Sequence, residues 1–391
     1  MKLLVVGFGQ CGGRVADEFA RIGRRAQTHR GMEIITGAYA VNTDEADLSG
    51  LATIKSDFQH RILIGGRKTS GHGVGKINEY AAEIAREDGD KVVDGIRKAK
   101  RFYDTDAFLV IASGAGGTGS GALPVMTKYI KERYIGKPVY ALIVLPFEHE
   151  ELTEERCVYN TAACLKSAFS VADAVFLVDN QRYVRKDASL RNNIFLINKQ
   201  IADPFYNMLC AGEEHKRRHI GAKMLDAGDI IQTLEGWTVI GWGKSPLPLI
   251  KMPWDATKDF RKKGKETHKG IQAMDEALSE LSLTCDPVDA GRALYLLSAP
   301  AKEMNVDIVK ELGDYLREIA GNAVIRNGDY PRETGQVTVT VILSQLSEVE
   351  RVRSFYSRAD EFIGTIKKRL EDVERKVADI ADVGKNIPSL L

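Results

Sequence analysis

A chain of 391 residues is long enough for two domains with separate cores, because single hydrophobic cores stop growing near roughly 250–300 residues. The 44% hydrophobic and 28% charged content is typical of a soluble globular protein, and a formal net charge of +1 excludes a general attraction to nucleic acid or anionic lipid. The five cysteines show no CxxC spacing, so neither a disulfide framework nor a zinc site is indicated, and a reducing, cytoplasmic setting fits best.

The sequence also predicts no membrane insertion. The apolar run Leu3-Leu4-Val5-Val6 is only as long as one strand and leads directly into glycine, which argues against a signal peptide. No apolar run approaches the ~20 residues that a membrane span needs.

The first half of the chain alternates short apolar runs with helical patterns. The apolarity of these runs is continuous, which indicates burial on both faces of a parallel sheet. Polar residues follow the strand ends, where such sheets bind ligands. We therefore expect a Rossmann-like parallel α/β domain. The predicted strands are Lys2 to Val6, Ala38 to Val41, Phe108 to Ala112, Val139 to Leu145 and Ala174 to Val178, and the predicted helices are Val15 to Ile22, Ile77 to Arg97 and Glu154 to Phe169.

The second half mixes strands and helices, which predicts a smaller α/β or α+β domain. A long connecting helix is expected first, and a polar, basic segment further on reads as a surface loop. The expected elements are the long helix Asn192 to Gly221, the strand Trp237 to Trp242, the loop Lys251 to Lys269, the strand Ala293 to Ala299, the helix Val306 to Ile319 and the strand Val337 to Leu343.

The C-terminal tail carries apolar residues at alternating spacings of three and four from Val349 to Ile380, which predicts amphipathic helix. A coiled coil with another chain is one interpretation. The simpler one is an outer helix, or a helical hairpin broken near Gly364, that packs on this protein's own body.

Glycine-rich loops are the features that indicate chemistry. Gly7-Phe8-Gly9-Gln10-Cys11-Gly12 satisfies G-x-G-x-x-G after the first strand, ASGAGGTGSGALP follows the strand at Phe108, and a third loop runs from Gly65 to Gly75. Glycines in such places let backbone N–H groups approach a phosphate at a helix N-terminus. A nicotinamide site has no use for two such loops, and a P-loop is excluded because G-x-x-x-x-G-K-[ST] is absent. Backbone amides, rather than a lysine, are therefore expected to hold phosphates.

The loops resemble a known family when they are taken in order. GGTGSG closely matches the tubulin signature, and GQCGGRV resembles the first nucleotide loop of tubulin and FtsZ. VNTDEADL, the loop Gly65 to Gly75, LPFEHEE and Asp179-Asn180 look like the successive nucleotide loops of that superfamily. The resemblance covers at least residues 1–245, and PFEHEELTEERCVYN looks most like the archaeal CetZ group, with FtsZ as the near alternative.

The resemblance implies a guanine nucleotide, GTP or GDP, with Mg²⁺, for which no protein ligand is assigned. Glycines around Thr118 would wrap the phosphates, Glu150 would contact the ribose, and Asn180 and Asn198 would bind guanine through their amides. Glu151 and Glu154 compete with Glu150, because two extra residues precede Arg156 in the family's spacing. Asn180 also fits a simple Asx turn. The implied nucleotide-binding residues are Gln10, Cys11, Gly12, Gly13, Arg14, Asn42, Asp44, Gly114, Ala115, Gly116, Gly117, Thr118, Gly119, Glu150, Asn180 and Asn198.

Asp226 and Asp229, in the sequence DAGD, resemble the family's catalytic loop. The resemblance implies that this pair enters the nucleotide pocket of the next subunit, where it orients an attacking water. Hydrolysis would then require assembly into head-to-tail filaments. The structural alternative is that both acids cap a turn or the helix that starts at Ile230.

The expected protein is thus a GTP-hydrolysing cytoskeletal protein with a role in cell shape or cell division. Its partners would be further copies of itself and adaptor proteins at the C-terminal helices. An NAD-dependent oxidoreductase and a non-polymerising nucleotide-binding scaffold are the alternatives. The expected division is a GTPase domain at 1–195, a central helix and catalytic loop at 196–235, an activation-type domain at 236–345 and a helical segment at 346–391.

Overall fold

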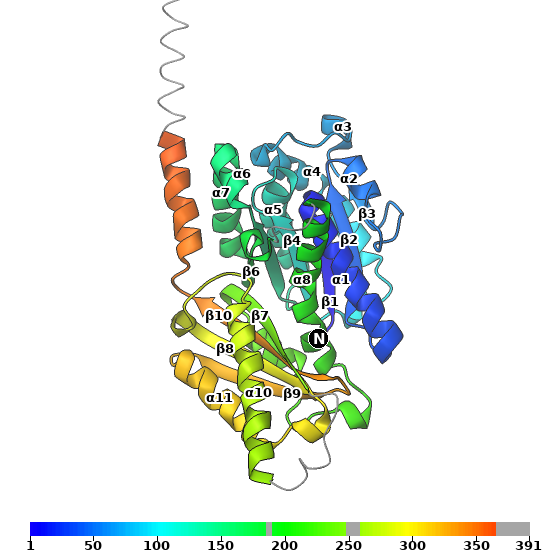
Figure 1. Ribbon diagram of the computed structural model, residues 1–391. Helices are drawn as coiled ribbons and strands as arrows, with labels where there is room; N and C mark the ends of the chain where they lie inside the picture. The colour runs from blue at the N-terminus through cyan, green and yellow to red at the C-terminus, as the bar shows by residue number, and fades with distance from the viewer. Residues whose placement is uncertain (185–189, 248–258, 365–391) are drawn as a thin grey trace, which may run out of the picture.

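The structure is a computed structural model that describes residues 1–184, 190–247 and 259–364. Strands and helices alternate through the first half, as the sequence predicts (Figure 1). The strands are β1 (Leu3–Phe8), β2 (Ile35–Asn42), β3 (Arg61–Leu63), β4 (Ala107–Ser113), β5 (Val139–Leu145), β6 (Ala174–Asp179), β7 (Gly236–Pro246), β8 (Ala290–Ala299), β9 (Val324–Pro331) and β10 (Gln336–Leu346). The helices are α1 (Gly9–Arg30), α2 (Glu45–Ser49), α3 (Gly66–Thr69), α4 (Asn78–Arg97), α5 (Thr118–Arg133), α6 (Glu148–Thr153), α7 (Glu155–Val171), α8 (Leu190–Ala211), α9 (Ala227–Thr233), α10 (Asp259–Ser279), α11 (Val306–Ile319) and 350–364.

Within the described residues the strands form one continuous sheet in the order β3-β2-β1-β4-β5-β6-β7-β10-β8-β9. The ladder is parallel from β3 to β7, β10 is antiparallel to both β7 and β8, and β9 is parallel to β8. The mixed α/β fold, with a Rossmann-like first half and a smaller second half, is confirmed.

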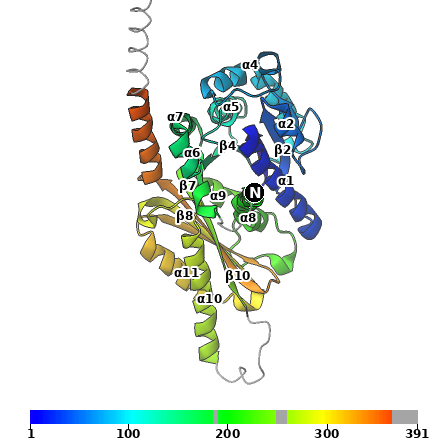
Figure 2. The same ribbon diagram turned by 45° about the horizontal axis from the view of Figure 1, so that its top comes forward.

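The hydrophobic core lies on the two faces of this sheet. Leu4, Val6 and Phe8 of β1 point to one face, which α4, α5 and α7 cover in the first half and α10, α11 and helix 350–364 cover in the second. Leu3 and Val5 point to the other face, which α1 and α8 cover. Figure 2 shows the two helical layers with the sheet between them. Both faces are buried, which explains why the strands read as continuous apolar runs.

The connecting helix is shorter than the sequence predicts. α8 ends at Ala211 instead of continuing to Gly221. Beyond it the chain turns toward the second half, where the Asp329 carboxylate accepts hydrogen bonds from the backbone N–H groups of Ala222 and Lys223 at 2.9 and 2.6 Å. A side chain on β9, a strand that the sequence analysis missed, therefore fixes the chain just beyond the predicted helix end. Within the predicted range, the Glu214 carboxylate accepts from the backbone N–H groups of His215 and Lys216, which takes the place of helical hydrogen bonds.

The expected surface loop at Lys251 to Lys269 is also corrected. Residues 251–258 lie outside the described residues, but those from Asp259 onward belong to α10. Ala273 and Ala277 on its C-terminal half are buried against β7. A Cβ on Gly241 would lie 2.0 Å from the carbonyl oxygen of Ala277, so glycine is required for this close approach. Packing at one end of the helix thus extends it through a basic segment with little helical pattern of its own.

The tail packs internally as far as it is described. Val349, Val352, Phe355 and Ala359 are buried in the core cluster that also contains α7 residues. The internal interpretation is therefore correct for residues 349–359, whereas the seam residue Ile363 is exposed. The rest of the predicted seam, from Ile366 to Ile380, lies outside the described residues. In the described part of the chain, no helix is both long enough and apolar enough to cross a membrane.

Candidate functional site

A cavity of about 360 Å³ opens at the carboxyl-terminal ends of β1 and β4. These strands are neighbours, and the helices that follow them, α1 and α5, cover opposite faces of the sheet. A crevice at such a switch point is where open α/β sheets bind ligands. The lining residues are Phe8, Gly9, Gln10, Cys11, Asn42, Asp44, Asp47, Gly73, Lys76, Ser113, Ala115, Gly116, Gly117, Thr118, Gly119 and Glu150.

The second glycine loop forms one wall of the cavity. Gly117 precedes α5, whose first backbone N–H groups have no partner within the helix and are suited to an anion. A Cβ on Gly116 would meet no atom within 4 Å, so this glycine faces open space. The Thr118 hydroxyl lies 2.7 Å from the hydroxyl of Thr43, which ties the loop to the end of β2.

Asn160 on α7 braces the same loop from behind. Its Nδ2 donates to the carbonyl oxygens of Lys76, Ala115 and Gly116, at 2.9, 3.2 and 3.3 Å. The side chain is fully buried. Sequence reasoning missed this role, although the residue closes the motif PFEHEELTEERCVYN.

Part of the first glycine loop lines the cavity, and the rest packs against the sheet. Gln10 and Cys11 line the cavity, whereas Gly12 is buried, and a Cβ there would lie 2.2 Å from the carbonyl oxygen of Ile111 on β4. Gly13 is also buried, and Arg14 is exposed. Neither of these two residues lines the cavity, and neither does Gly114, where a Cβ would lie 2.9 Å from the Thr161 side chain.

Burial dominates the chemistry of Cys11. It raises the pKa of this thiol to about 12, with Arg14 lowering the pKa and Glu150 raising it to smaller extents. The raised pKa keeps the thiol neutral at physiological pH, which disfavours a nucleophilic role.

The carboxylates of α2 lie on the opposite side of the cavity. Asp44 caps this helix by accepting from the backbone N–H of Asp47 at 3.1 Å. Asp47, which sequence reasoning missed, accepts in turn from the side-chain amides of Gln10 and Asn42. Asn42, Asp44 and Gln10 are thus brought together as expected.

The third loop contributes Gly73, and Lys76, the residue directly after this loop, also lines the cavity. Lys76 has a left-handed backbone, with φ at 63°, and its ammonium forms an ion pair with Glu154. Burial lowers the pKa of Lys76, but the Glu154 carboxylate outweighs burial and raises it above the ordinary value. The lysine therefore adds a permanent positive charge to a cavity that also holds carboxylates, and no motif had indicated it.

The competing glutamates have different surroundings. Glu150 lines the cavity, and its Oε2 accepts from the backbone N–H of Phe147 at 3.0 Å. Glu151 is buried against Arg351 and Arg358, and Glu154 pairs with Lys76. Of the three, only Glu150 lies where a ligand in this cavity would touch it.

The predicted guanine-binding amides do not line this cavity. Asn180 begins the 3₁₀ turn η2 (Asn180–Tyr183) at the end of β6, and Asn198 is buried on α8. The Asx turn at this strand end belongs to Asp179, whose carboxylate accepts from the N–H of Gln181 at 3.0 Å. The guanine-binding roles of both asparagines stay predictions.

The acidic pair lies toward the amino-terminal ends of the parallel strands, whereas the cavity lies at their carboxyl-terminal ends. α8 has 22 residues, about 33 Å of helix, and returns the chain to the amino-terminal edge, where the Met1 amine donates to the carbonyl of Leu209 at 3.1 Å (Figure 1). Asp226 caps α9 there and accepts from the N–H of Asp229 at 2.8 Å. Arg326 of β9 lies 3.6 Å from the Asp229 carboxylate. Asp226 thus caps a helix that begins at Ala227 instead of Ile230, neither acid lines the cavity of its own chain, and the catalytic role of the pair stays a prediction.

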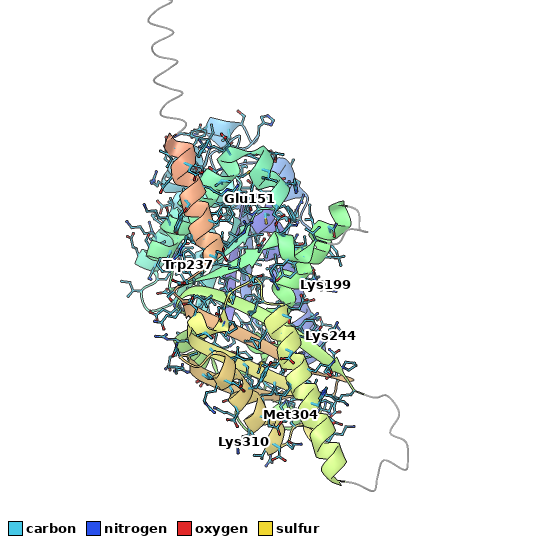
Figure 3. All side chains as sticks on the ribbon, turned by 60° about the vertical axis from the view of Figure 1, so that its left-hand side comes forward. Glu151, Lys199, Trp237, Lys244, Met304 and Lys310 are labelled. Carbon is cyan, nitrogen blue, oxygen red and sulfur yellow. The ribbon has the colours of Figure 1, made fainter. Side chains whose placement is uncertain are left out.

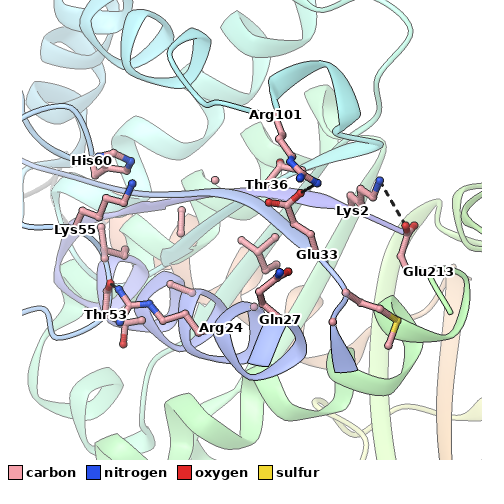
Figure 4. A pocket seen from close by; sticks show the side chains of 18 of the residues that line it. Lys2, Arg24, Gln27, Glu33, Thr36, Thr53, Lys55, His60, Arg101 and Glu213 are labelled. Atoms are coloured by element: carbon pink, nitrogen blue, oxygen red, sulfur yellow. Dashed lines mark hydrogen bonds and ion pairs between the residues drawn. The ribbon is translucent and has the colours of Figure 1, made fainter. Parts of the chain in front are cut away.

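A second cavity, of about 470 Å³, lies beside the α1–β2 connection (Figure 4). Its charged side chains are largely paired: Arg101 with Glu33 at 2.8 Å, and Lys2 with Glu213 at 3.6 Å. None of the predicted site residues lines it.

Comparisons with known proteins identify the family of the chain. A family model described as the GTPase domain of the Tubulin/FtsZ family matches residues 2–186, and one described as the C-terminal domain of tubulin-like CetZ matches residues 187–361. Tubulin-like protein CetZ1 of Haloferax volcanii is 32% identical over 377 residues, which are 92% of each chain. Tubulin-like protein CetZ of Pyrococcus abyssi is 25% identical over 387 residues, 97% of this chain and 95% of the relative.

Solved structures show the same relationship. The GDP-bound monomer of CetZ1 from Haloferax volcanii superposes with a TM-score of 0.79 at 30% identity, covering 92% of this chain and 99% of that one. The GTPγS-bound protofilament of CetZ2 from the same organism has a TM-score of 0.80 at 28% identity, covering 94% and 100%. The chain therefore belongs to the tubulin-like CetZ family of the tubulin/FtsZ superfamily.

Proposed function

We propose that this protein binds and hydrolyses GTP and polymerises head-to-tail into cytoskeletal filaments, with the active site completed by the Asp226 loop of the adjacent subunit. The observation that carries the proposal is the separation of the two parts of the site. The glycine-loop cavity lies at the carboxyl-terminal ends of the parallel strands, and the acidic pair lies beyond the far end of α8 and does not line that cavity.

The residues around the cavity are suited to a nucleoside triphosphate. The N-terminus of α5 offers free backbone N–H groups, Gly116 leaves room in front of them, and Lys76 adds a positive charge. Glu150 lies at the rim, where a ribose hydroxyl would donate to it. Relatives whose solved structures hold GDP or GTPγS support the guanine nucleotide.

Mg²⁺ is part of the proposal because phosphoryl transfer needs a cation to neutralise developing charge. Among the described residues, no three His, Cys, Asp or Glu side chains cluster in a way that would hold a metal ion. In the proposal the ion binds mainly to phosphate oxygens, and the acidic groups that line the cavity are Asp44, Asp47 and Glu150.

In the proposed reaction, Asp226 and Asp229 of one subunit face the triphosphate held by the next. They orient the attacking water and accept its proton, while the α5 amides stabilise the charge on the phosphates. A contact between these two opposite ends of the subunit is heterologous, and a heterologous contact generates a filament when its rotation does not close a ring. The protofilament formed by CetZ2 of Haloferax volcanii supports this assembly.

GTPase rate measured against protein concentration tests the proposal. A site built across an interface predicts a rate that rises more steeply than linearly, together with GTP-dependent pelleting. A strictly proportional rate would mean that each subunit hydrolyses alone. GTP binding without pelleting would instead favour the non-polymerising scaffold. Family membership removes the support for an NAD-dependent oxidoreductase, and a role in cell shape or cell division is the cellular function that we propose.

A further inference from the structure

Two arginines of helix 350–364 bind a buried carboxylate beside the candidate nucleotide cavity. The Glu151 side chain is only 3% exposed and lies on α6, next to this helix in Figure 3. Arg358 Nη1 donates to its Oε2 at 2.5 Å, and Arg351 donates to both of its carboxylate oxygens. Such paired donation to a carboxylate fixes geometry as well as charge. The C-terminal helix is thereby tied to α6.

Arg351 also contacts a second segment. Its Nε lies 3.5 Å from the carboxylate of Asp179, which ends β6 and precedes Asn180. Burial raises the pKa of Asp179, and Arg351 is among the groups that lower it and so favour the ionised form. The backbone N–H of Glu148 donates to the Gln181 side chain at 3.3 Å, which joins α6 directly to η2. Arg351 therefore bridges the segment that carries Glu150 and the segment that carries Asn180.

Apolar packing keeps the two arginines in place. Val352, Phe355 and Ala359 of the same helix are buried, and the Arg351 guanidinium lies 4.8 Å from the centre of the Phe355 ring. If the helix leaves this surface, Glu151 becomes a buried charge without a cation, which is a strongly unfavourable state. α6 would then have to move, and Glu150 would move with it.

We propose that Arg351 and Arg358 are positioning residues that couple docking of helix 350–364 to the ribose and base side of the nucleotide site. The proposal rests on the proposed function, since it takes Glu150 and Asn180 as nucleotide contacts. Coupling between two sites is reciprocal, so bound GDP should hold the helix more firmly in place. A partner that pulls on the C-terminal segment would loosen the nucleotide.

The test compares two ligands by calorimetry on the full chain. GDP contacts the whole site, whereas inorganic tripolyphosphate contacts only the phosphate loop. Arg351→Ala is expected to weaken GDP on the order of tenfold and to leave tripolyphosphate affinity within about twofold. Arg351→Lys should recover part of the loss. Arg353→Ala is the matched control, because Arg353 is on the same helix, is 74% exposed and pairs only with Glu348 among the ion pairs of the described residues.

Hydrogen exchange gives a second readout. GDP is expected to slow amide exchange across residues 350–364 in the wild type and in Arg353→Ala, but not in Arg351→Ala. If Arg351→Ala does not fold, Arg351→Lys and Arg358→Lys carry the test, because each keeps the charge but loses the paired geometry. Both should weaken GDP selectively.

The outcomes separate two failures. If the wild type binds no GDP, the proposed function fails. If the wild type binds GDP and Arg351→Ala binds it equally well, only the coupling fails. Equal losses of GDP and tripolyphosphate affinity would also overturn the coupling, because they indicate general damage to the fold.

Discussion

The Asp226 carboxylate accepts a hydrogen bond from the backbone N–H of Asp229, with 2.8 Å between Oδ1 and N. The first residue of the proposed catalytic pair is thus the N-cap of α9 and positions the second. Asp229 is 39% exposed on its side chain and lies near Arg326, so its carboxylate is accessible from solvent. Asp226 has a structural and a proposed catalytic role, and these can be separated because asparagine caps helices as well as aspartate does.

Asp226→Asn should remove the proposed catalytic charge and keep the cap. We expect GTP affinity and the free energy of unfolding to change little, and the assembly-dependent GTPase rate to fall by roughly 10²- to 10⁴-fold. Asp226→Ala should lose the same activity and also about 1 kcal/mol of stability.

Two measurements check this prediction: steady-state GTPase assays for activity, and separate urea denaturation for the free energy of unfolding. Asp314→Asn is a suitable control, because it removes an exposed carboxylate from α11 that pairs with Arg317. Near-normal hydrolysis by Asp226→Asn would leave the residue with its capping role alone.

Substitutions of Thr43 and Thr118, whose hydroxyls bond to each other, should distinguish effects on stability from effects on ligand binding. Replacing either by valine removes the same 2.7 Å hydrogen bond and leaves a buried hydroxyl unpaired, so each should cost about 1–3 kcal/mol of unfolding free energy. Only Thr118 lines the cavity, so only Thr118→Val should weaken GTP, on the order of tenfold.

Chemical denaturation and nucleotide titration of both variants are the measurements. The double variant should lose less stability than the sum of the single ones, because the interaction is lost only once. An equal loss of GTP affinity in Thr43→Val would show that the loop's shape, and not the Thr118 hydroxyl, binds the ligand.

Two neighbouring glycines should respond differently to alanine. At Gly116 the new methyl group meets no protein atom within 4 Å, so the fold should keep its stability while GTP binding is blocked from inside the cavity. At Gly117 the methyl group would lie 2.6 Å from Val74 Cγ2 and 2.8 Å from Lys76 Cα, which predicts overpacking of about 1–3 kcal/mol. Thermal unfolding and GDP calorimetry distinguish the two. Tight GDP binding by Gly116→Ala would argue against phosphates at this loop.

The Cys11 thiol should be unreactive and should make stability depend on alkaline pH. Its pKa is raised from 9.0 to about 12 by burial, so near pH 8 iodoacetamide should label it at least about 100-fold more slowly in the folded chain than in urea. Between pH 9 and about 12, the thiol stays protonated in the folded state but ionises in the unfolded state. The stability contributed by this thiol is therefore complete below pH 9 and is lost as the pH rises toward 12. Cys11→Ser should reduce the alkaline loss. Rapid labelling of native Cys11 would contradict the prediction.

The sequence alone determined the features that depend on local pattern. The helix Val306 to Ile319 and the strand Val139 to Leu145 were predicted with their observed bounds. The hydrophobic pattern lies within each element, and the turn residues that end it are its immediate neighbours in the sequence. The glycine loops were recognisable for the same reason, since a glycine run between a strand and a helix is a local signal. β9 was missed because the turn-type residues Asn327, Gly328 and Asp329 interrupt its apolar pattern, and it becomes a strand only through its pairing with β8.

Only the tertiary structure decided which of several equivalent side chains reaches the cavity. Glu150, Glu151 and Glu154 are alike in sequence, but one accepts from Phe147, one is neutralised by arginines two hundred residues away along the chain, and one pairs with Lys76. Lys76 and Asn160 reach their places in the same way, through contacts between segments that are far apart in the sequence. A local pattern fixes which face of an element is apolar, whereas the partner of a polar side chain depends on segments that become neighbours only when the chain folds.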